Sequence, residues 1–471
     1  MAVPRVSALP NPNRILKQAR TGRHGYKSGD ETRGRGVVFY RDDAHWCPYC
    51  EKVQLLLEEK NVPYKVMTVP MMCYASGPKP DWFLEIQPNG MLPAAVVDSR
   101  RLGTSDEIMF YVEERYRDVP MLPVADSEVA RRIPKLLRLE REFFSAWVRW
   151  LTTRGRGFAN NLQRGFEDTL ARVERELPDP STSQSAFFLG DAFRAGQPSF
   201  IDCTFAPFLE RASASLAYNK AFKIRGRGDG RYPRLERWFK AMEAVPAYQA
   251  LMADAYSHAY SLPPQLGGCP VDTEELAREV EDAGAAAVNT REGNVSWRIP
   301  LRRLTERDVD YSVFMQDEDM CESRRNAAEA LEVNLEAVAK FATRGCTRRN
   351  ASSQRYGYAP LADPGAPETP AAVTPVKIAL EAVVTAMKSS TAQQFDEFPY
   401  FEQGKEPAVT ARVAMQPVIQ AMDVHNASRD DVLASLTYLS KRIGVPRDMG
   451  FKEARQLRAH LVWAITGLER N

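Results

Sequence analysis

Short apolar runs in the first quarter of the chain predict a small β-sheet. Each run is bounded by polar residues or by glycine and proline, which is typical of buried strands. The runs lie at 37–40, 64–69 and 94–97. Apolar residues at helical spacing, among them Val53 and Leu57, follow the first run, and a charged turn at 98–101 leads to a second helix at 106–116. The predicted order is therefore strand, helix, strand, a connection, two strands and a helix.

Beyond residue 120 the strand pattern stops and amphipathic helices follow. Apolar residues in these segments recur every three or four positions, which marks one buried face. Helices are predicted at 129–150, 166–177, 273–288, 321–343, 376–388, 430–442 and 451–468. A further helix opens at Ser199, where Asp202 three residues on completes a capping box before a long apolar run. Most of the chain is therefore predicted to be helical.

Proline-rich stretches divide the helical part. Pro263, Pro264 and Pro270 predict a domain boundary after Leu262, and five prolines within 350–375 predict a loop. Composition and predicted elements together divide the chain into four parts. They are a basic tail at 1–36, an α/β domain at 37–120, an all-α domain at 121–262 and an additional, mostly helical domain at 263–471 with its proline-rich loop at 350–375.

The overall charge and the length of the apolar runs exclude several classes of partner. The 471 residues include 63 Lys and Arg against 61 Asp and Glu, a formal charge of only +2. Such a chain has no overall basic field that would bind nucleic acid or an anionic membrane. Its uninterrupted apolar stretches are far shorter than the roughly 20 residues that a membrane span needs. We therefore expect a soluble protein with no nucleic-acid and no membrane partner.

The cysteines and the N-terminal tail indicate the compartment. The seven cysteines are odd in number, and only Cys47 and Cys50 are close together, which argues against a secreted disulfide framework. Residues 1–36 hold eight basic and two acidic residues without the apolar core of a secretory signal. We expect a cytoplasmic protein, or one of a plastid or organelle stroma if this tail is the remnant of a transit peptide. A solvated basic tail is the other interpretation.

Cys47-Pro48-Tyr49-Cys50 is the sharpest chemical motif of the sequence. It stands between a predicted strand and a predicted helix, where the free N–H groups of a first turn favour a thiolate at an exposed Cys47. Cys50, one turn inward and less exposed, could resolve a mixed disulfide on Cys47. Pro48 suits the first helical position, which needs no N–H. A zinc half-site is the alternative, but no second Cys/His pair has matching spacing. We predict a redox dithiol and no metal site.

A second feature lies at 89–93, directly before a predicted strand. A cis Leu92–Pro93 bond would turn the chain so that the backbone of Leu92 faces Cys47. That backbone could then pair with a peptide-like ligand in the manner of a strand. A trans turn proline is the default for an isolated proline, but the cysteine motif upstream favours the cis form.

These motifs together resemble a known family. Residues 37 to about 260 resemble the cysteine-type glutathione transferases of the omega, lambda and dehydroascorbate-reductase classes. They are most similar to the iota-like proteins, which combine a CPxC motif with an extra C-terminal domain. The matching stretches are 46–50, 79–83, 89–93, 104–106 and 199–202. The resemblance implies an α/β thioredoxin-like domain, followed by an all-α transferase domain and an additional mostly α-helical region.

The resemblance also implies a glutathione site, with glutathione as co-substrate. Around the catalytic Cys47 and Cys50 it would contain Pro48, Tyr49, Lys79, Leu92, Pro93, Thr104, Ser105 and Asp106. Lys79 would contact the glycyl end, and the Leu92 backbone would pair with the cysteinyl backbone. Ser105, at a helix N-terminus suited to an anion, would bind the γ-glutamyl carboxylate. Many relatives have an acid where this chain has Thr104, so Asp106 would supply the negative charge for the ligand's ammonium group.

A nucleophilic cysteine changes the chemistry that is expected. Transferases with serine or tyrosine at this place stabilise a free glutathione thiolate, whereas Cys47 would itself enter a mixed disulfide. We therefore expect a glutathione-dependent thiol transferase or reductase that acts on glutathionylated substrates, disulfides or dehydroascorbate. Four aromatic residues in the first predicted long helix are mainly packing residues, of which one or two could face the second substrate. They are Phe143, Phe144, Trp147 and Trp150.

Two other functions remain open from the sequence. The 209 residues from 263 onward could recruit a protein partner, with the rest of the chain as a non-enzymatic, redox-sensitive glutathione-binding scaffold. An iron–sulfur or haem carrier that uses Cys47 with bound glutathione is the third hypothesis. The expected partners are glutathione and a small electrophile, a disulfide or a glutathionylated substrate. A homodimer is possible, since transferases of this fold commonly dimerise, but the large added domain could cover that surface.

Overall fold

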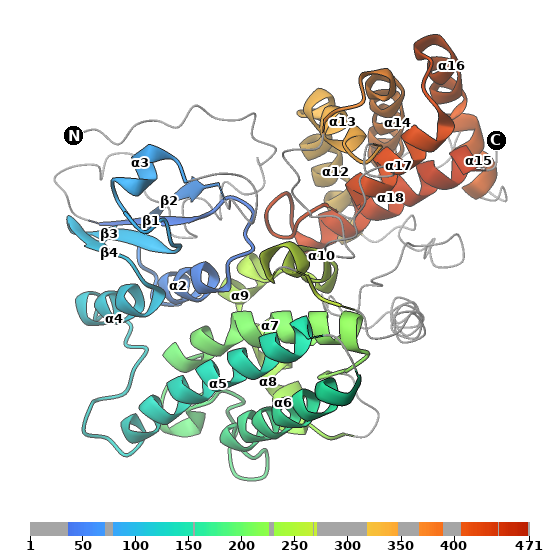
Figure 1. Cartoon of the computed structure of the whole chain (residues 1–471). Helices are drawn as coiled ribbons and strands as arrows, with labels where there is room; N and C mark the ends of the chain where they lie inside the picture. The colour runs from blue at the N-terminus through green and yellow to red at the C-terminus, as the bar shows by residue number, and fades with distance from the viewer. Residues whose placement is uncertain are drawn as a thin grey trace. The chain divides into compact units, whose positions relative to one another are not determined.

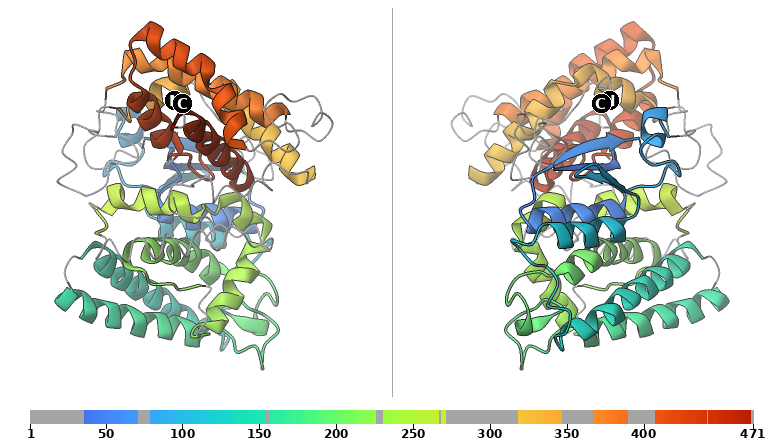
Figure 2. Two further views of the ribbon diagram at one scale, coloured as in Figure 1. Left: turned by 90° about the vertical axis from the view of Figure 1, so that its right-hand side faces the viewer. Right: turned by 90° about the vertical axis from the view of Figure 1, so that its left-hand side faces the viewer.

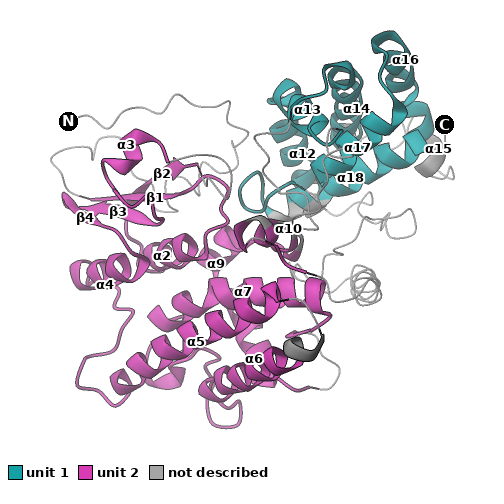
Figure 3. Ribbon diagram, viewed as in Figure 1, with its two compact units in different colours: residues 1–16, 281–471 teal, residues 17–280 magenta. Residues whose placement is uncertain are grey.

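The computed structural model describes most of the chain. The described residues are 36–70, 79–153, 156–225, 230–266, 268–270, 318–346, 367–389, 407–440 and 442–469. The chain forms two compact units, which Figure 3 shows in different colours. We call residues 17–280 the sheet unit and residues 1–16 with 281–471 the helical unit.

A four-stranded sheet opens the sheet unit (Figure 1). Its strands are β1 Val37–Asp42, β2 Tyr64–Val69, β3 Ala94–Val97 and β4 Arg100–Leu102, in the spatial order β2-β1-β3-β4. β2 is parallel to β1, whereas β3 is antiparallel to β1 and β4 is antiparallel to β3. Val37 in β1 lies between Tyr64 of β2 and Val97 of β3. The first three strands lie where the apolar runs predict them.

β4 corrects the turn that was predicted at 98–101. Only Asp98 and Ser99, both with positive φ, form the reversal. Arg100 and Arg101 already pair with β3. Both arginines are exposed on this edge strand, so the sequence has no apolar signal there.

Helices cover both faces of the sheet. α2 Pro48–Glu59 and α4 Ser105–Arg115 lie on one face, and the short α3 Asp81–Leu84 lies on the other (Figure 1). The alternation of side chains along β1 accounts for this arrangement. Val37 and Phe39 belong to the core that contains α2, whereas Tyr40 packs against Phe83 of α3. The start of α2 therefore lies at the C-terminal end of a central strand.

Beyond α4, the regular elements among the described residues of the sheet unit are helices, which lie on the α2 side of the sheet (Figure 2). They are η1 Ala130–Arg132, α5 Ile133–Thr152, α6 Arg156–Glu176, η2 Gly190–Ala192, α7 Phe200–Lys220, α8 Pro233–Glu243, α9 Pro246–Leu251 and α10 Ala255–Leu266. The N–H and the hydroxyl of Ser199 donate to Asp202 Oδ2 at 2.8 and 2.6 Å. Oδ1 of Asp202 accepts from the Phe188 N–H and the Trp238 indole. The predicted capping box therefore fixes the start of α7 to two other segments.

α10 continues through the boundary that was predicted after Leu262. Pro263 lies inside this helix, and Cys269 beyond it is fully buried in the core of the sheet unit. The predicted boundary therefore falls within a helix. A proline can stand inside a helix because its φ suits the helix, although one backbone hydrogen bond is lost and the ring crowds the preceding turn.

The described part of the helical unit contains helices only. They are α12 Glu318–Glu332, α13 Leu335–Thr343, α14 Pro370–Ser389, α15 Pro407–Ala414, α16 Gln416–His425, α17 Arg429–Ser440 and α18 Phe451–Glu469. The predicted helix at 321–343 is split at Val333 and Asn334. α14 begins at Pro370, so the end of the loop predicted at 350–375 is helical, because proline is well placed at the start of a helix. The helix predicted at 273–288 lies outside the described residues.

One described helix is long and apolar enough to cross a membrane. It spans Pro370–Lys388, its most apolar window has a mean hydropathy of 1.3, and half of that window is buried. Val376, Leu380 and Val383 of this helix belong to the core of the helical unit. Its composition is therefore that of a helix packed in a protein core.

Candidate functional site

Cys47 is the N-cap residue of α2. Its backbone is extended, with φ −72° and ψ 113°, and its Sγ accepts the N–H of Cys50 at 3.4 Å. Pro48 occupies the first helical turn, as the sequence predicts. A sulfur that accepts an N–H of this turn lies at the positive end of the helix dipole, which favours a thiolate. The structure confirms the predicted position of Cys47, whereas its role remains a prediction.

Both sulfurs of the motif are buried. Cys47 is 6% exposed and Cys50 is 0% exposed, so Cys50 is the less accessible, as predicted. The prediction that Cys47 is exposed, which followed from its place at a helix start, is wrong. The residue packs into the core of the sheet unit. Burial raises the pKa of Cys50 well above its usual value, and the neighbouring Cys47 and Asp42 add to this. Cys50 therefore holds its proton at neutral pH.

The Leu92–Pro93 peptide bond is cis, as predicted. The carbonyl oxygen of Leu92 lies 3.8 Å from Cys47 Sγ, within reach of a thiol hydrogen. Gly90, two residues earlier, has a φ of 67° that favours glycine. The structure therefore places the backbone of Leu92 beside the sulfur of Cys47, although the two residues are 45 positions apart in the chain.

Lys79 lies next to the same loop. A Cβ on Gly90 would lie 3.3 Å from Cγ of Lys79. The Lys79 ammonium group donates to the carbonyl oxygen of Pro70 at 2.5 Å. Its predicted contact with the glycyl end of glutathione remains a prediction.

The start of α4 places three predicted site residues side by side. Thr104 caps the helix, with Oγ1 accepting the N–H of Glu107 at 3.2 Å. Ser105 is the first helical residue, and its hydroxyl lies 3.4 Å from Asp106 Oδ1. Asp106 also pairs with Lys52 of α2 at 2.6 Å. Burial opposes ionisation, but Lys52 holds the pKa of Asp106 below its usual value. Asp106 therefore already has a cation as its partner.

Tyr49 contacts a group of residues that the sequence does not link to it. Its ring lies 6.0 Å from the ring of Phe144 and 5.4 Å from that of Phe208. The Arg141 guanidinium lies over all three rings and donates to the Tyr49 hydroxyl at 3.2 Å. Phe144 is thus the predicted aromatic that reaches the cysteine motif, whereas the other three are buried. Arg141 was missed because it lies on an ordinary polar position of α5.

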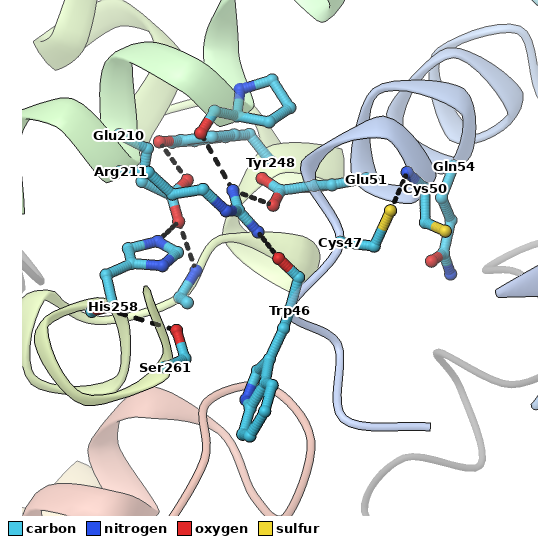
Figure 4. A network of polar contacts seen from close by, with 12 residues as sticks. Trp46, Cys47, Cys50, Glu51, Gln54, Glu210, Arg211, Tyr248, His258 and Ser261 are labelled. Carbon is cyan, nitrogen blue, oxygen red and sulfur yellow. Dashed lines mark hydrogen bonds and ion pairs between the residues drawn. The ribbon is translucent and has the colours of Figure 1, made fainter. Parts of the chain in front are cut away.

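A buried polar network lies directly behind the cysteine motif (Figure 4). Arg211 of α7 donates to Glu51 Oε2 at 2.6 Å. Glu210 accepts from the Tyr248 hydroxyl at 2.7 Å and contacts the His258 ring. Burial raises the pKa of Glu51 and of Glu210 to about 7, and it lowers the pKa of His258 to about 3. His258 is therefore neutral near pH 7, and Arg211 is the cation of the network.

Sequence reasoning did not find this network. Glu51 directly follows the motif, but Arg211 lies 160 positions away with no motif around it. The signal that could have found it is the pair of charged residues at 210 and 211 inside a long apolar run. Such charges are rarely buried unless they are paired.

Asp42 supplies a third potential metal donor beside the two cysteines. Its carboxylate and the two sulfurs lie within 4.8 Å of one another, and all three residues are buried. The carboxylate, however, already accepts the N–H of Trp46 and lies 3.4 Å from Arg41 Nη2. We therefore keep the prediction that this site holds no metal.

Comparisons with known proteins identify two family domains in the chain. Residues 46–115 match the family model of the glutathione S-transferase N-terminal domain, and residues 157–241 match that of the C-terminal domain. The chain belongs to the glutathione S-transferase family. The predictions of the family, of the thioredoxin-like fold with its helical additions and of glutathione as co-substrate are confirmed.

Individual relatives cover part of the chain. Glutathione S-transferase DHAR3, chloroplastic, of Arabidopsis thaliana is 29% identical over 179 residues, which are 38% of this chain and 59% of that protein. A stringent starvation protein A homolog of Pasteurella multocida is 30% identical over 163 residues, which are 35% of this chain and 69% of that protein. The crystal structure of Chlamydomonas reinhardtii dehydroascorbate reductase aligns at 21% identity with a TM-score of 0.35, over 46% of this chain and 92% of that one.

Proposed function

We propose that this chain is a glutathione-dependent thiol transferase or reductase with Cys47 as its nucleophile. The observation that carries the proposal is the position of Cys47 Sγ, which accepts the N–H of Cys50 in the first turn of α2 and lies beside the carbonyl of Leu92. A buried sulfur in this setting has a donor for its anion and a neighbouring backbone that can hold a peptide-like ligand. The family membership supports an enzyme over a non-catalytic scaffold.

The proposed reaction is thiol–disulfide exchange. The Cys47 thiolate attacks the glutathione sulfur of a mixed disulfide R–S–S–G, which forms a Cys47–S–S–G adduct and releases R–S⁻ to take up a proton. A second glutathione thiolate then attacks the adduct, releases oxidised glutathione and regenerates Cys47. Alternatively Cys50 loses its proton and attacks Cys47, which releases glutathione and leaves an intramolecular disulfide. Reduction of dehydroascorbate at the expense of two glutathione molecules would use the same adduct.

The residues around the sulfur are proposed to hold glutathione. The backbone of Leu92, before the cis Pro93, would pair with the cysteinyl part, and Lys79 would meet the glycyl carboxylate. Ser105 and the free N–H groups at the start of α4 would bind the γ-glutamyl carboxylate. Thr104 and Asp106 complete that end of the site, and Pro48 and Tyr49 complete the other, next to the sulfur. This assignment follows the family resemblance residue by residue.

The test is to identify the adduct. The protein is treated with oxidised glutathione, digested and analysed by mass spectrometry, and its turnover of a glutathionylated peptide with glutathione is measured in parallel. We expect the glutathione mass on Cys47 together with turnover. An adduct on any other cysteine, or none, would overturn the role of Cys47. An adduct without turnover would favour the scaffold.

A further inference from the structure

One guanidinium reaches the turn that carries Cys47 from the helical part of the sheet unit. Arg211 of α7 is 1% exposed, and its two terminal nitrogens bind different groups of that turn (Figure 4). Nη2 donates to the carbonyl oxygen of Trp46 at 3.2 Å, and Nη1 donates to Glu51 Oε2 at 2.6 Å. Trp46 precedes Cys47, and Glu51 follows it by about one helical turn. Arg211 therefore holds both ends of the segment that carries the sulfur.

Arg211 is itself held in place. Nη1 also donates to the carbonyl oxygen of Pro207 on the same helix at 2.9 Å. The adjacent Glu210 accepts from the Ala253 N–H at 2.8 Å and from Tyr248 and His258, which ties this part of α7 to α9 and α10. A buried charge is stable only where partners of good geometry surround it. The guanidinium is therefore restricted to one position against the Cys47 turn.

The charge of Arg211 acts on the sulfur as well. Among the described residues, the titratable or charged groups around Cys47 include Arg41 and Asp42 at the end of β1, Tyr49, Cys50 and Glu51 on α2, and Arg211 on α7. Burial lowers the pKa of Arg211, but Glu51, Glu210 and Cys47 raise it above its usual value. Because this interaction is mutual, the positive guanidinium favours a negative sulfur. Of the two arginines in this set, Arg41 pairs with Asp42, whereas Arg211 bonds to both ends of the Cys47 turn.

We propose that Arg211 is a positioning residue for Cys47, which fixes the Trp46–Cys47 peptide and the first turn of α2 and places one positive charge near the sulfur. The inference rests on the proposed role of Cys47 as the nucleophile. It gives α7 a part in the thiol chemistry, although α7 contributes no reacting atom.

The test compares two full-length variants that differ at Arg211. The single variant, Glu51→Gln, removes the carboxylate and keeps the shape of the side chain. The double variant, Glu51→Gln with Arg211→Met, also removes the guanidinium, and it does so without leaving a charged Glu51 buried and unpaired. The rate of Cys47 alkylation by iodoacetamide is followed from pH 6 to pH 9, with the site identified by mass spectrometry. Thermal unfolding is measured for each variant.

The two variants should change the reactivity in different directions. Glu51→Gln should react at the parental rate or faster, since a negative charge near the sulfur is removed. The double variant should react about tenfold more slowly at pH 7 than Glu51→Gln, and its half-maximal rate should move to a higher pH. A double variant within twofold of Glu51→Gln overturns the proposal. A purely structural role would lower both rates and move neither half-maximal pH.

Arg225 offers a matched control in the same unit. It is buried, pairs with Glu243 and Glu236 of α8, and lies over the ring of Phe239 in the same helix. Glu243→Gln with Arg225→Met should lower the unfolding temperature and leave the alkylation of Cys47 unchanged. A slower reaction in this control would mean that lost stability alone slows Cys47, which would also overturn the proposal.

Two outcomes separate this inference from the proposed function. If the double variant does not fold, Arg211→Lys keeps the charge and removes the fork that bridges two acceptors. It should react about threefold more slowly than the parent, and a parental rate overturns the inference. If Cys47→Ser retains turnover, the proposed function fails, whatever Arg211 does. An essential Cys47 whose alkylation is indifferent to Arg211 overturns the inference alone.

Discussion

Lys52 of α2 reaches Asp106 at the start of α4 with 2.6 Å between Nζ and Oδ1, although Lys52 is 1% exposed and Asp106 is 66% exposed. A pair with one partner in solvent adds at most about 1 kcal/mol to the free energy of unfolding. Its larger effect concerns a ligand, because the carboxylate already has a counter-charge. The hydroxyl of Ser105 and the free N–H groups of α4 should therefore contribute more to γ-glutamyl binding than Asp106 does.

Ser105→Ala should raise the KM for glutathione about tenfold and lower kcat much less, because this contact holds a part of the ligand that does not react. Steady-state kinetics with varied glutathione measures the two constants. Ser127→Ala, at a half-buried turn serine whose hydroxyl donates to the carbonyl oxygen of Val124, is the control and should change neither constant. A loss in kcat at unchanged KM would contradict the proposed place of Ser105.

Cys47→Ser should lower turnover of a glutathionylated peptide by more than about a hundredfold, because the hydroxyl cannot form the mixed disulfide. The circular dichroism spectrum should be unchanged, since serine keeps the cap position at the start of α2. Cys203→Ser, at a fully buried cysteine of α7, is the control and should retain turnover. Activity within a few-fold of the parent would exclude Cys47 as the nucleophile.

Cys50→Ser should separate the two routes of resolution. Turnover with excess glutathione should persist within about threefold, because free glutathione can attack the Cys47 adduct. Reduction of a protein disulfide should be lost, since it needs the second thiol. The variant should also unfold more easily by about 1 kcal/mol, because a hydroxyl replaces a fully buried sulfur. Equal losses in both assays would mean that Cys50 is structural.

Glu210→Gln should change how stability depends on pH. The pKa of Glu210 in the folded chain is raised to about 7 from 4.5, so its contribution to the free energy of unfolding is full below pH 4.5 and is lost as the pH rises to about 7. Because glutamine does not titrate, the free energy of unfolding of the variant does not fall in this way as the pH rises. Relative to the parent, its free energy of unfolding should therefore rise between pH 4.5 and pH 7, by on the order of 3 kcal/mol. Urea unfolding at several pH values measures the difference, which should be flat below pH 4.5. A difference that is flat throughout would contradict the raised pKa.

The end of α10 determines where the sheet unit can be cut. A fragment that ends at residue 280 should fold and bind glutathione, whereas one that ends at 262 should unfold at a lower temperature or aggregate. The shorter fragment lacks the last turn of α10, the buried Cys269 and the Pro270 carbonyl that accepts from Lys220 at 3.1 Å. Thermal unfolding and glutathione binding of both fragments measure this. Equal behaviour would place the boundary at 262, as the prolines predict.

Local patterns predicted much of the sheet unit. The apolar runs gave β1, β2 and β3, and the serine and the acid of the capping box gave the start of α7, because these signals lie within a few residues of one another. The place of Cys47 at a helix start followed in the same way. The predicted element order includes a fourth strand, but the residues of β4 were assigned to a turn, since an edge strand of exposed arginines lacks the apolar pattern on which the prediction depended.

Long-range contacts were beyond the reach of the sequence pattern. The bond from Arg211 to the Trp46 carbonyl joins residues 165 positions apart, and Arg141 reaches Tyr49 over 92 positions. Arg141 does not differ in its local pattern from a solvated residue on an amphipathic helix. Arg211 stands out only by its place beside Glu210 inside a long apolar run, and that pattern does not show which residue it meets. The burial of Cys47 has the same origin, because helices distant in the sequence supply its neighbours.

The capping box at the start of α7 determines which side chain of that helix faces the Cys47 motif. Asp202 fixes where this helix begins, and Arg211 follows nine residues later, or about 13 Å along the axis. A slip of the helix by one residue would rotate Arg211 by about 100° and direct its guanidinium away from Trp46. The register of α7, set at its first turn by a serine and an aspartate, therefore decides which side chain faces the cysteine motif.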